Sequence, residues 1–437
     1  MQSNADNIDR IITVSESLQR IPRNAQVVVI LAEKGITEIP DCYFEDCHQL
    51  KTVQMPKDIH TIRDFAFQNC KNLKTIVLPK KLYSIGECCF HKCLKLKFIK
   101  LPNSVHHVQK EAFAHCSKLE YIRLSKNMKC LPNHLFADCA TLKYLDIPSS
   151  IREIKFWAFK NCKSLVGISL PDTISTIPEH CFHNCTSLKK FKWKVSRELQ
   201  ESYITMDCYA FFNCNNLKKV NLSESSVYCL KEGCFKDCKK LTTVIISKQT
   251  KNIHAGAFEN CSSLQYINYG DKVDDLDSSN NQYGIDLIHT NHFDNNVFRE
   301  CTSIESIKIY GHQKFRGNTL LGCDNLQRVS LPSHFHLNDH LALYGYPTKL
   351  REIMIRTKAR NISRDVVNKV LVPWVITNPG LLERKCTEDG LLPIQVFFEV
   401  LLLLRPKNWR CNDTELVEIL RIFLWEAPTT ITLFMPK

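Results

Sequence analysis

One short segment recurs along most of this chain: a phenylalanine, a cysteine three residues later and a leucine three residues after that. The cysteines of the first seven copies lie 23 residues apart, at Cys47, Cys70, Cys93, Cys116, Cys139, Cys162 and Cys185. Five more copies follow at steps of 29, 24, 23, 40 and 22 residues, with Cys214, Cys238, Cys261, Cys301 and Cys323. So many copies in phase predict a stack of one small structural unit, because long-period repeats are typical of solenoids.

The residues after each cysteine predict a short β-strand. They follow the pattern LxxIxLP or a close variant, as in Leu96 to Pro102, in which alternate positions are apolar. Such alternation indicates a strand with one buried face, and the proline ends the strand because it lacks a hydrogen-bond donor. A second apolar pair, such as Ile151 and Ile154, precedes the next phenylalanine. One unit is too short to bury its own apolar side, so we expect the units to stack and share one core.

These residues carry a family resemblance. The phrases IPEHCFHNCTSLKKFKW (177–193) and IHAGAFENCSSLQYI (253–267) resemble the BspA-type (Treponema-like) leucine-rich repeats. The resemblance implies a repeat solenoid that is mostly parallel β with little helix. It implies a scaffold rather than a particular function, since members include bacterial surface adhesins and large protein sets of unicellular eukaryotes. The segment NPGLLERKCTEDGLLPIQVFFEV (378–400) resembles the tails of leucine-rich repeat proteins from diatoms and related algae.

The repeat divides the chain into three expected parts. Residues 1–26 are expected to form an N-terminal cap segment, and residues 27–355 a solenoid of about 12–13 repeats. Residues 357–437 lose the period and contain apolar stretches of helical length, which predict a small α-helical C-terminal domain. The 40-residue step contains an acidic insertion at about 270–296, with six aspartates against one lysine. A solvated loop, a calcium loop and a flap over a basic surface all fit this insertion.

The twelve repeat cysteines could form disulfides, bind a metal ion or fill the core. In-register stacking would place neighbouring Cα atoms about 4.8 Å apart, within the range of a disulfide. Parallel stacking, however, points these side chains the same way rather than toward one another. We therefore expect buried, reduced thiols that act as small apolar fillers. Cys181 and Cys185 have a spacing that zinc sites use, but no second pair recurs at a fixed distance, so we predict no metal and no cofactor.

Composition and motifs argue against an enzyme. Glycine makes up only 13 of the 437 residues, and no GxGxxG or GxxxxGK[ST] motif, nucleophile elbow or kinase motif set occurs. The N-terminus does not resemble a secretory signal. The longest apolar run, residues 391–404, is shorter than the roughly 20 residues of a spanning helix. The expected location is therefore cytoplasmic, or alternatively nuclear.

The third and fifth positions of each LxxIxL segment are expected to face solvent and to form a binding surface. The predicted contact residues are an aromatic group with flanking cations and a group of lysines: Phe98, Lys100, Tyr121, Arg123, Tyr144, Lys189, Lys190, Lys192 and Lys219. The net charge of +13 favours acidic partners. The sequence thus predicts a non-catalytic scaffold that binds an acidic protein or peptide. The alternatives are cell-surface adhesion, binding of a polyanion such as nucleic acid, and a merely solvated basic face.

Overall fold

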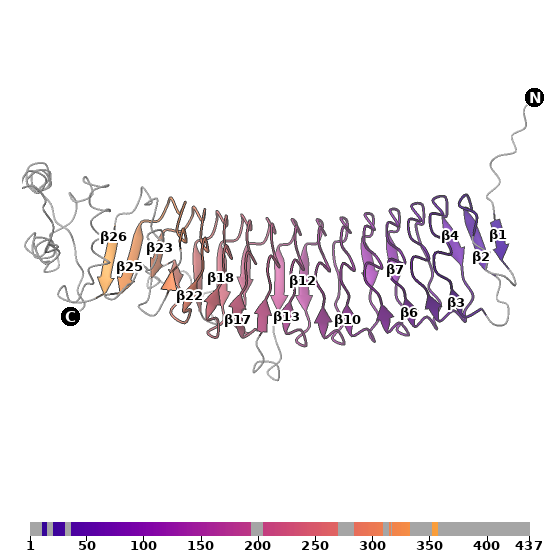
Figure 1. Cartoon of the computed structure of the whole chain (residues 1–437), viewed down its shortest axis with the longest axis horizontal. Helices are drawn as coiled ribbons and strands as arrows, with labels where there is room; N and C mark the ends of the chain where they lie inside the picture. The colour runs from indigo at the N-terminus through magenta and orange to yellow at the C-terminus, as the bar shows by residue number, and fades with distance from the viewer. Residues whose placement is uncertain are drawn as a thin grey trace, which may run out of the picture.

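The computed structural model describes residues 11–14, 21–30, 36–193, 204–269, 284–308, 314–315, 317–332 and 352–356. Within these segments every strand pairing is parallel and no helix occurs. The strands form an elongated, gently curved stack of coils (Figure 1). The predicted parallel β-solenoid is therefore confirmed. The proposed helical domain at 357–437 and most of the acidic insertion lie outside the described residues.

One row of strands is built mainly from the LxxIxL segments, and we call it the LxxIxL sheet. Its strands pair in consecutive groups along the stack. They are β1 (Ile11–Val14), β2 (Val27–Ile30), β4 (Thr52–Gln54), β7 (Phe98–Lys100), β9 (Tyr121–Arg123), β12 (Gly167–Leu170), β14 (Lys190–Trp193), β16 (Lys219–Asn221), β18 (Thr243–Ile246), β20 (Tyr266–Tyr269), β21 (Ile285–Asp286), β23 (Ser306–Lys308), β25 (Arg328–Pro332) and β26 (Glu352–Arg356). β1 pairs with β2, so this sheet includes a strand before residue 27, where the solenoid was expected to begin.

The apolar pairs that precede each phenylalanine form a second row of short strands, here called the second sheet. Its strands are β3 (Glu38–Ile39), β5 (Thr61–Ile62), β6 (Ser84–Ile85), β8 (His107–Val108), β10 (Cys130–Leu131), β11 (Glu153–Ile154), β13 (Thr176–Ile177), β15 (Ile204–Met206), β17 (Val227–Leu230), β19 (Asn252–Ile253), β22 (His292–Phe293) and β24 (Lys314–Phe315). Between the two sheets lies one continuous core of buried leucine, isoleucine, phenylalanine and cysteine side chains.

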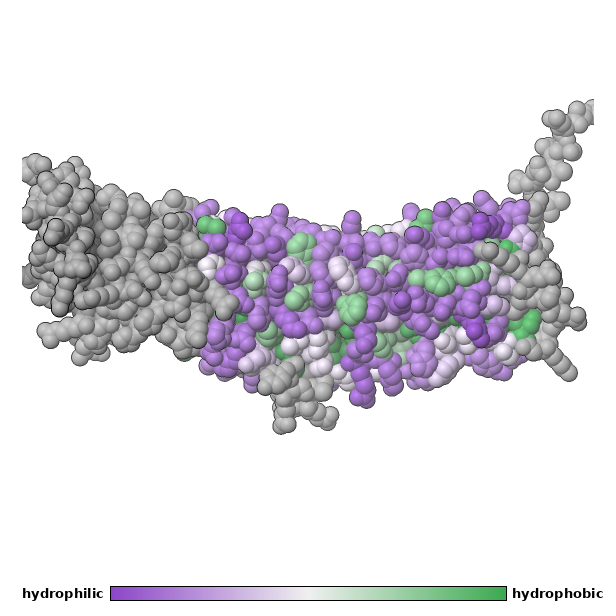
Figure 2. All heavy atoms as spheres, in the orientation of Figure 1, coloured by the Kyte–Doolittle hydropathy of each residue, from purple (hydrophilic) through white to green (hydrophobic). Residues whose placement is uncertain are grey.

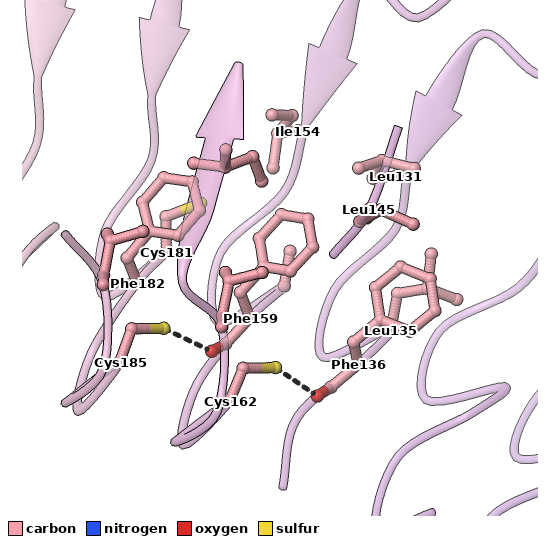
Figure 3. Close-up of a cluster of buried hydrophobic side chains, with 14 of the residues drawn as sticks. Leu131, Leu135, Phe136, Leu145, Ile154, Phe159, Cys162, Cys181, Phe182 and Cys185 are labelled. Carbon is pink, nitrogen blue, oxygen red and sulfur yellow. Dashed lines mark hydrogen bonds between the residues drawn. The ribbon is translucent and has the colours of Figure 1, made fainter. Parts of the chain in front are cut away.

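The repeat phenylalanines form a ladder of stacked rings along this core. Neighbouring ring centroids are 4.7–6.1 Å apart and the rings are nearly parallel. The ladder contains Phe44, Phe67, Phe90, Phe113, Phe136, Phe159, Phe182, Phe211, Phe235, Phe258 and Phe298. This spacing follows the separation of adjacent parallel strands, about 4.8 Å. The in-register stack therefore places each ring against its equivalents in the neighbouring turns (Figure 3).

The repeat cysteines do more than fill space. Each from Cys70 onward donates its thiol hydrogen to the backbone carbonyl of the phenylalanine in the preceding repeat, with Sγ–O distances of 3.0–3.3 Å. Figure 3 shows two of these bonds, from Cys162 to Phe136 and from Cys185 to Phe159. The Phe136 carbonyl also accepts the backbone N–H of Cys139, so both of its lone pairs are used. Our expectation of an apolar filler was therefore incomplete: the burial is as expected, but the thiol also bonds neighbouring turns.

A third ladder runs along the turns just before these cysteines. The residue before each repeat cysteine adopts a positive φ, 58° at Asn161 and 59° at Asn184. Asparagine and aspartate tolerate this left-handed region better than most residues. The Asn161 amide donates to Asp138 at 2.8 Å, and the Asn184 amide donates to Asn161 at 2.9 Å. Asparagine here thus supplies both the turn geometry and a bond between neighbouring turns.

Candidate functional site: the outer face of the LxxIxL sheet

The strands of the LxxIxL sheet from β7 to β16 alternate between the core and solvent as predicted. In β7 and β9, Ile99 and Ile122 are buried, and the residues on either side of each are exposed. All nine predicted contact residues are solvent-exposed: Phe98, Lys100, Tyr121, Arg123, Tyr144, Lys189, Lys190, Lys192 and Lys219. Their exposure is confirmed, whereas their role in binding remains a prediction.

Strand register aligns three of these side chains in a row. Phe98 is the register partner of Tyr121, and a parallel bridge then joins Tyr121 to Tyr144. We call these three residues the aromatic row. They are 50%, 41% and 61% exposed, respectively, although large aromatic side chains usually bury most of their surface. A row of aromatic rings that lies open to solvent is therefore available to another molecule.

The same register continues from the aromatic row to the lysines. Tyr144 is bridged to Gly167, and Gly167 is the register partner of Lys190. Two positions further along the strands, Ser169 pairs with Lys192. We define Lys189, Lys190, Lys192 and Lys219 as the lysine cluster. The outer face thus changes from aromatic to cationic along the axis of the stack.

The lysine cluster has no nearby neutralising charge within the described part of the chain. None of its four ammonium groups lies within 4.0 Å of a carboxylate there, whereas Lys97 and Lys110 form ion pairs with Glu120 and Glu87. Four cations on adjoining strands repel one another, and an incoming anion would relieve that repulsion. This part of the face is therefore suited to acidic groups.

Further along the solenoid, the outward positions of the sheet are covered. Thr243 and Ile245 of β18 occupy outward positions but are only 4% and 3% exposed. Tyr266 and Lys308, which the repeat pattern also placed at solvent-facing positions, are half-buried. The pattern alone could not show this difference, because the third and fifth positions recur in every repeat. The candidate surface therefore consists of the aromatic row and the lysine cluster, and it extends over the turns from β7 to β16.

A stack of histidine and aromatic rings on the turns was not predicted from the sequence. His134, Trp157, His180 and Tyr209 stack in order, with ring centroids 5.8, 3.9 and 5.1 Å apart. His183 lies beside this stack, and its Nδ1 is 3.0 Å from the Nδ1 of His180. Burial, with smaller contributions from nearby His180 and Lys160, lowers the pKa of His183 from 6.5 to about 4. The sequence did contain a signal for this stack, because each of the four stacked residues lies two positions before a repeat phenylalanine.

The described segments contain neither a metal-binding cluster nor a membrane-spanning helix. There, no group of three or more histidine, cysteine, aspartate or glutamate side chains is placed to hold a metal ion. The same part of the chain contains no helix long and apolar enough to cross a membrane. On the side shown in Figure 2, the described surface is mostly hydrophilic, with short hydrophobic rows.

Comparisons with known proteins agree with this geometry. The family model described as "BspA type Leucine rich repeat region (6 copies)" matches residues 37–166, 106–201, 158–287 and 288–370. A leucine-rich repeat protein from Bacteroides ovatus is 26% identical with a TM-score of 0.56, and the match covers 76% of this chain and 84% of that one. A leucine rich cell surface protein from Faecalibacterium prausnitzii is 22% identical with a TM-score of 0.50, over 82% and 94% of the two chains. No curated protein matches this chain.

Proposed function

Because the chain belongs to the BspA-type leucine-rich repeat family, we propose that it is a non-catalytic scaffold that binds an acidic protein or peptide on the outer face of its LxxIxL sheet. One observation carries the proposal: an exposed aromatic row lies in register with a lysine cluster that no described carboxylate neutralises. A repeat solenoid presents such a surface without needing a cleft, since its stacked strands form an extended face.

The two parts of this face have different roles in binding. Burial of an exposed aromatic ring contributes about 1.5–3 kcal/mol, and aromatic residues are over-represented among the residues that dominate interface energetics. Lysine side chains on a rim add less affinity but attract an acidic partner and raise its rate of association. We therefore expect the aromatic row to hold the partner and the lysine cluster to select it.

The chemistry of the thiols supports a non-catalytic role. The twelve repeat cysteines are potential nucleophiles, and all of them are buried. Desolvation raises the pKa of Cys116 to about 12 and the pKa of Cys162 well above its usual range. A thiol in this state is protonated at neutral pH and reacts poorly. The repeat thiols therefore hold turns together rather than attack substrates.

The test compares wild-type protein with two variants in crosslinking pull-downs. The face variant combines Tyr121→Ala, Arg123→Ala, Tyr144→Ala and Lys190→Ala. The control variant combines Tyr83→Ala, Lys129→Ala and Arg152→Ala, which remove exposed side chains of the same kinds beside the second sheet. We expect the face variant to lose partners that the control retains, and the purified partner to bind less tightly as salt rises. An unchanged partner set in the face variant would remove this face from consideration.

A further inference from the structure

We infer that the partner segment is an extended polypeptide lying along the solenoid axis, with a large apolar side chain on the aromatic row and acidic side chains on the lysine cluster. This inference rests on the function proposed above and specifies the ligand of the same face. It follows from the order of the side chains in one register row: Phe98, Tyr121, Tyr144, Gly167 and Lys190. A ligand that follows this row meets aromatic rings first and cations afterwards.

Gly167 is the one position in this row without a side chain. Its backbone does not require glycine, since its φ lies outside the left-handed region. A Cβ added there would meet Lys190 at 3.5 Å, which is an ordinary van der Waals contact. Glycine within a strand is less stable than alanine, so nothing in the fold accounts for the missing side chain. The bare backbone lets a ligand approach the sheet closely between Tyr144 and Lys190.

Strand spacing sets the length of the ligand. Three strand steps separate Tyr121 from Lys190, which is about 14 Å at about 4.8 Å per step. An extended peptide advances about 3.3 Å per residue, so its apolar and acidic side chains should lie about four to five residues apart. A peptide with these groups much closer together cannot reach both parts of the face.

The charge pattern favours a peptide over single-stranded nucleic acid. Beside the aromatic row, Lys100 and Arg123 are followed by the exposed carboxylate of Asp146, whereas the lysine cluster is uniformly positive. Nucleic acid carries a phosphate at every nucleotide, so one that follows the row would bring phosphates close to Asp146. A polypeptide can confine its negative charge to one end, as this face requires.

The experiment measures fluorescence anisotropy of labelled peptides with the full chain. The lead peptide has one tryptophan, a four-residue Thr/Ser spacer and four glutamates, so that the tryptophan and the first glutamate lie five residues apart. Three matched peptides replace tryptophan by alanine, replace the glutamates by glutamines, or shorten the spacer to one residue. We expect the lead peptide to bind about tenfold more tightly than each of the three, because only the lead peptide reaches both parts of the face.

Variants of the protein assign each peptide group to its contact. In Tyr121→Ala/Tyr144→Ala protein, the tryptophan and alanine peptides should bind equally. In Lys190→Ala/Lys192→Ala/Lys219→Ala protein, the glutamate and glutamine peptides should bind equally. Gly167→Leu should weaken the lead peptide about tenfold at an unchanged Tm, while Gly167→Ala should change binding little.

The outcomes separate this inference from the proposed function. If the lead peptide does not bind, if both spacers give equal affinity, or if an oligothymidine binds more tightly than any peptide, the inference fails. The pull-down with the face variant then decides the proposed function independently, because it needs no assumption about spacing. Loss of lead-peptide binding in Gly167→Leu protein together with a lower Tm would also count against the inference, since the effect would then be structural.

Discussion

The inward and outward positions of the LxxIxL strands differ in how much their residue types vary from turn to turn. Inward positions from β7 to β14 are occupied by similar residues, with Ile99, Ile122 and Ile168 all buried. The outward position beside them changes from phenylalanine through tyrosine and glycine to lysine over the same turns. An inward side chain touches its equivalents in both neighbouring turns, so it must fit the shape they share. An outward side chain meets water or a partner and is free to differ.

This contrast shows where function can reside in such a chain. The phenylalanine, cysteine and asparagine ladders are common to many turns, so they specify the stack but cannot single out one place on it. The aromatic row and the lysine cluster occur at particular turns and therefore define a location. The following predictions test this division between an inside that determines stability and an outside that determines binding.

The largest expected effect is on the phenylalanine ladder. Phe159 is fully buried, and its ring centroid lies 5.7 Å from that of Phe136 and 5.2 Å from that of Phe182. Phe159→Ala leaves a cavity between both neighbours, so we expect a loss of about 3–5 kcal/mol in the free energy of unfolding. Urea unfolding followed by circular dichroism measures it. A loss below about 1 kcal/mol would show that the ladder does not hold the turns together.

A smaller effect is expected at the turns. Asn161→Ala removes an amide that bonds to Asp138 and Asn184, and it leaves an alanine at a positive φ. We expect a loss of about 1–3 kcal/mol. Asn161→Gly removes the same hydrogen bonds but tolerates the backbone, so it should be less harmful than alanine. Equal losses in the two variants would show that backbone conformation contributes nothing at this turn.

The histidine stack should make stability depend on pH. The folded pKa of His183, about 4, is below its value of about 6.5 in an unfolded chain, so the unfolded state binds more protons between these values. The stability contributed by neutral His183 is fully present above about pH 6.5 and is lost as the pH falls toward 4. Tm measured across this range should fall less steeply in His183→Phe protein. Parallel curves would show that His183 is not shielded.

The smallest effect on stability is expected at the aromatic row. Tyr144 is 61% exposed, so Tyr144→Ala should change the free energy of unfolding by no more than about 0.5 kcal/mol. The same substitution should weaken the partner about tenfold, because exposed aromatic residues anchor interfaces. Urea unfolding and a binding titration on one protein sample report both values. A variant that binds normally would place the partner elsewhere.

The sequence predicted the interior of the solenoid better than its surroundings. A repeat of 23 residues with apolar alternation predicts parallel strands and a shared core, since a single unit cannot bury its own apolar side. It did not reveal the thiol-to-carbonyl bonds, because a cysteine in a pattern looks like any small apolar residue. The contact between His180 and Trp157 depends on stacking between turns, which a linear inspection of scattered histidines does not display.

The candidate surface was predictable only in part, because the repeat pattern predicts the direction of a side chain but not its accessibility. Alternation placed Phe98, Tyr121 and Tyr144 outward, and the structure agrees. The burial of Thr243 and Ile245 at equivalent positions was not predictable, because a repeat pattern gives the direction of a side chain but not what covers it. Local periodicity therefore specifies orientation, whereas accessibility depends on the whole molecule.

Cysteine labelling tests most directly whether the LxxIxL strands from β7 to β16 have one side sealed in a shared core and the other side open to solvent. Tyr121→Cys places a thiol on the outer face, five residues from the native Cys116 in the core. Folded protein is treated with N-ethylmaleimide, and mass spectrometry follows both sites over time. We expect rapid modification at position 121, while Cys116 and the next ladder thiol, Cys139, remain unmodified until urea unfolds the chain. Equal rates at the outer and ladder positions in folded protein would show that the core is not sealed.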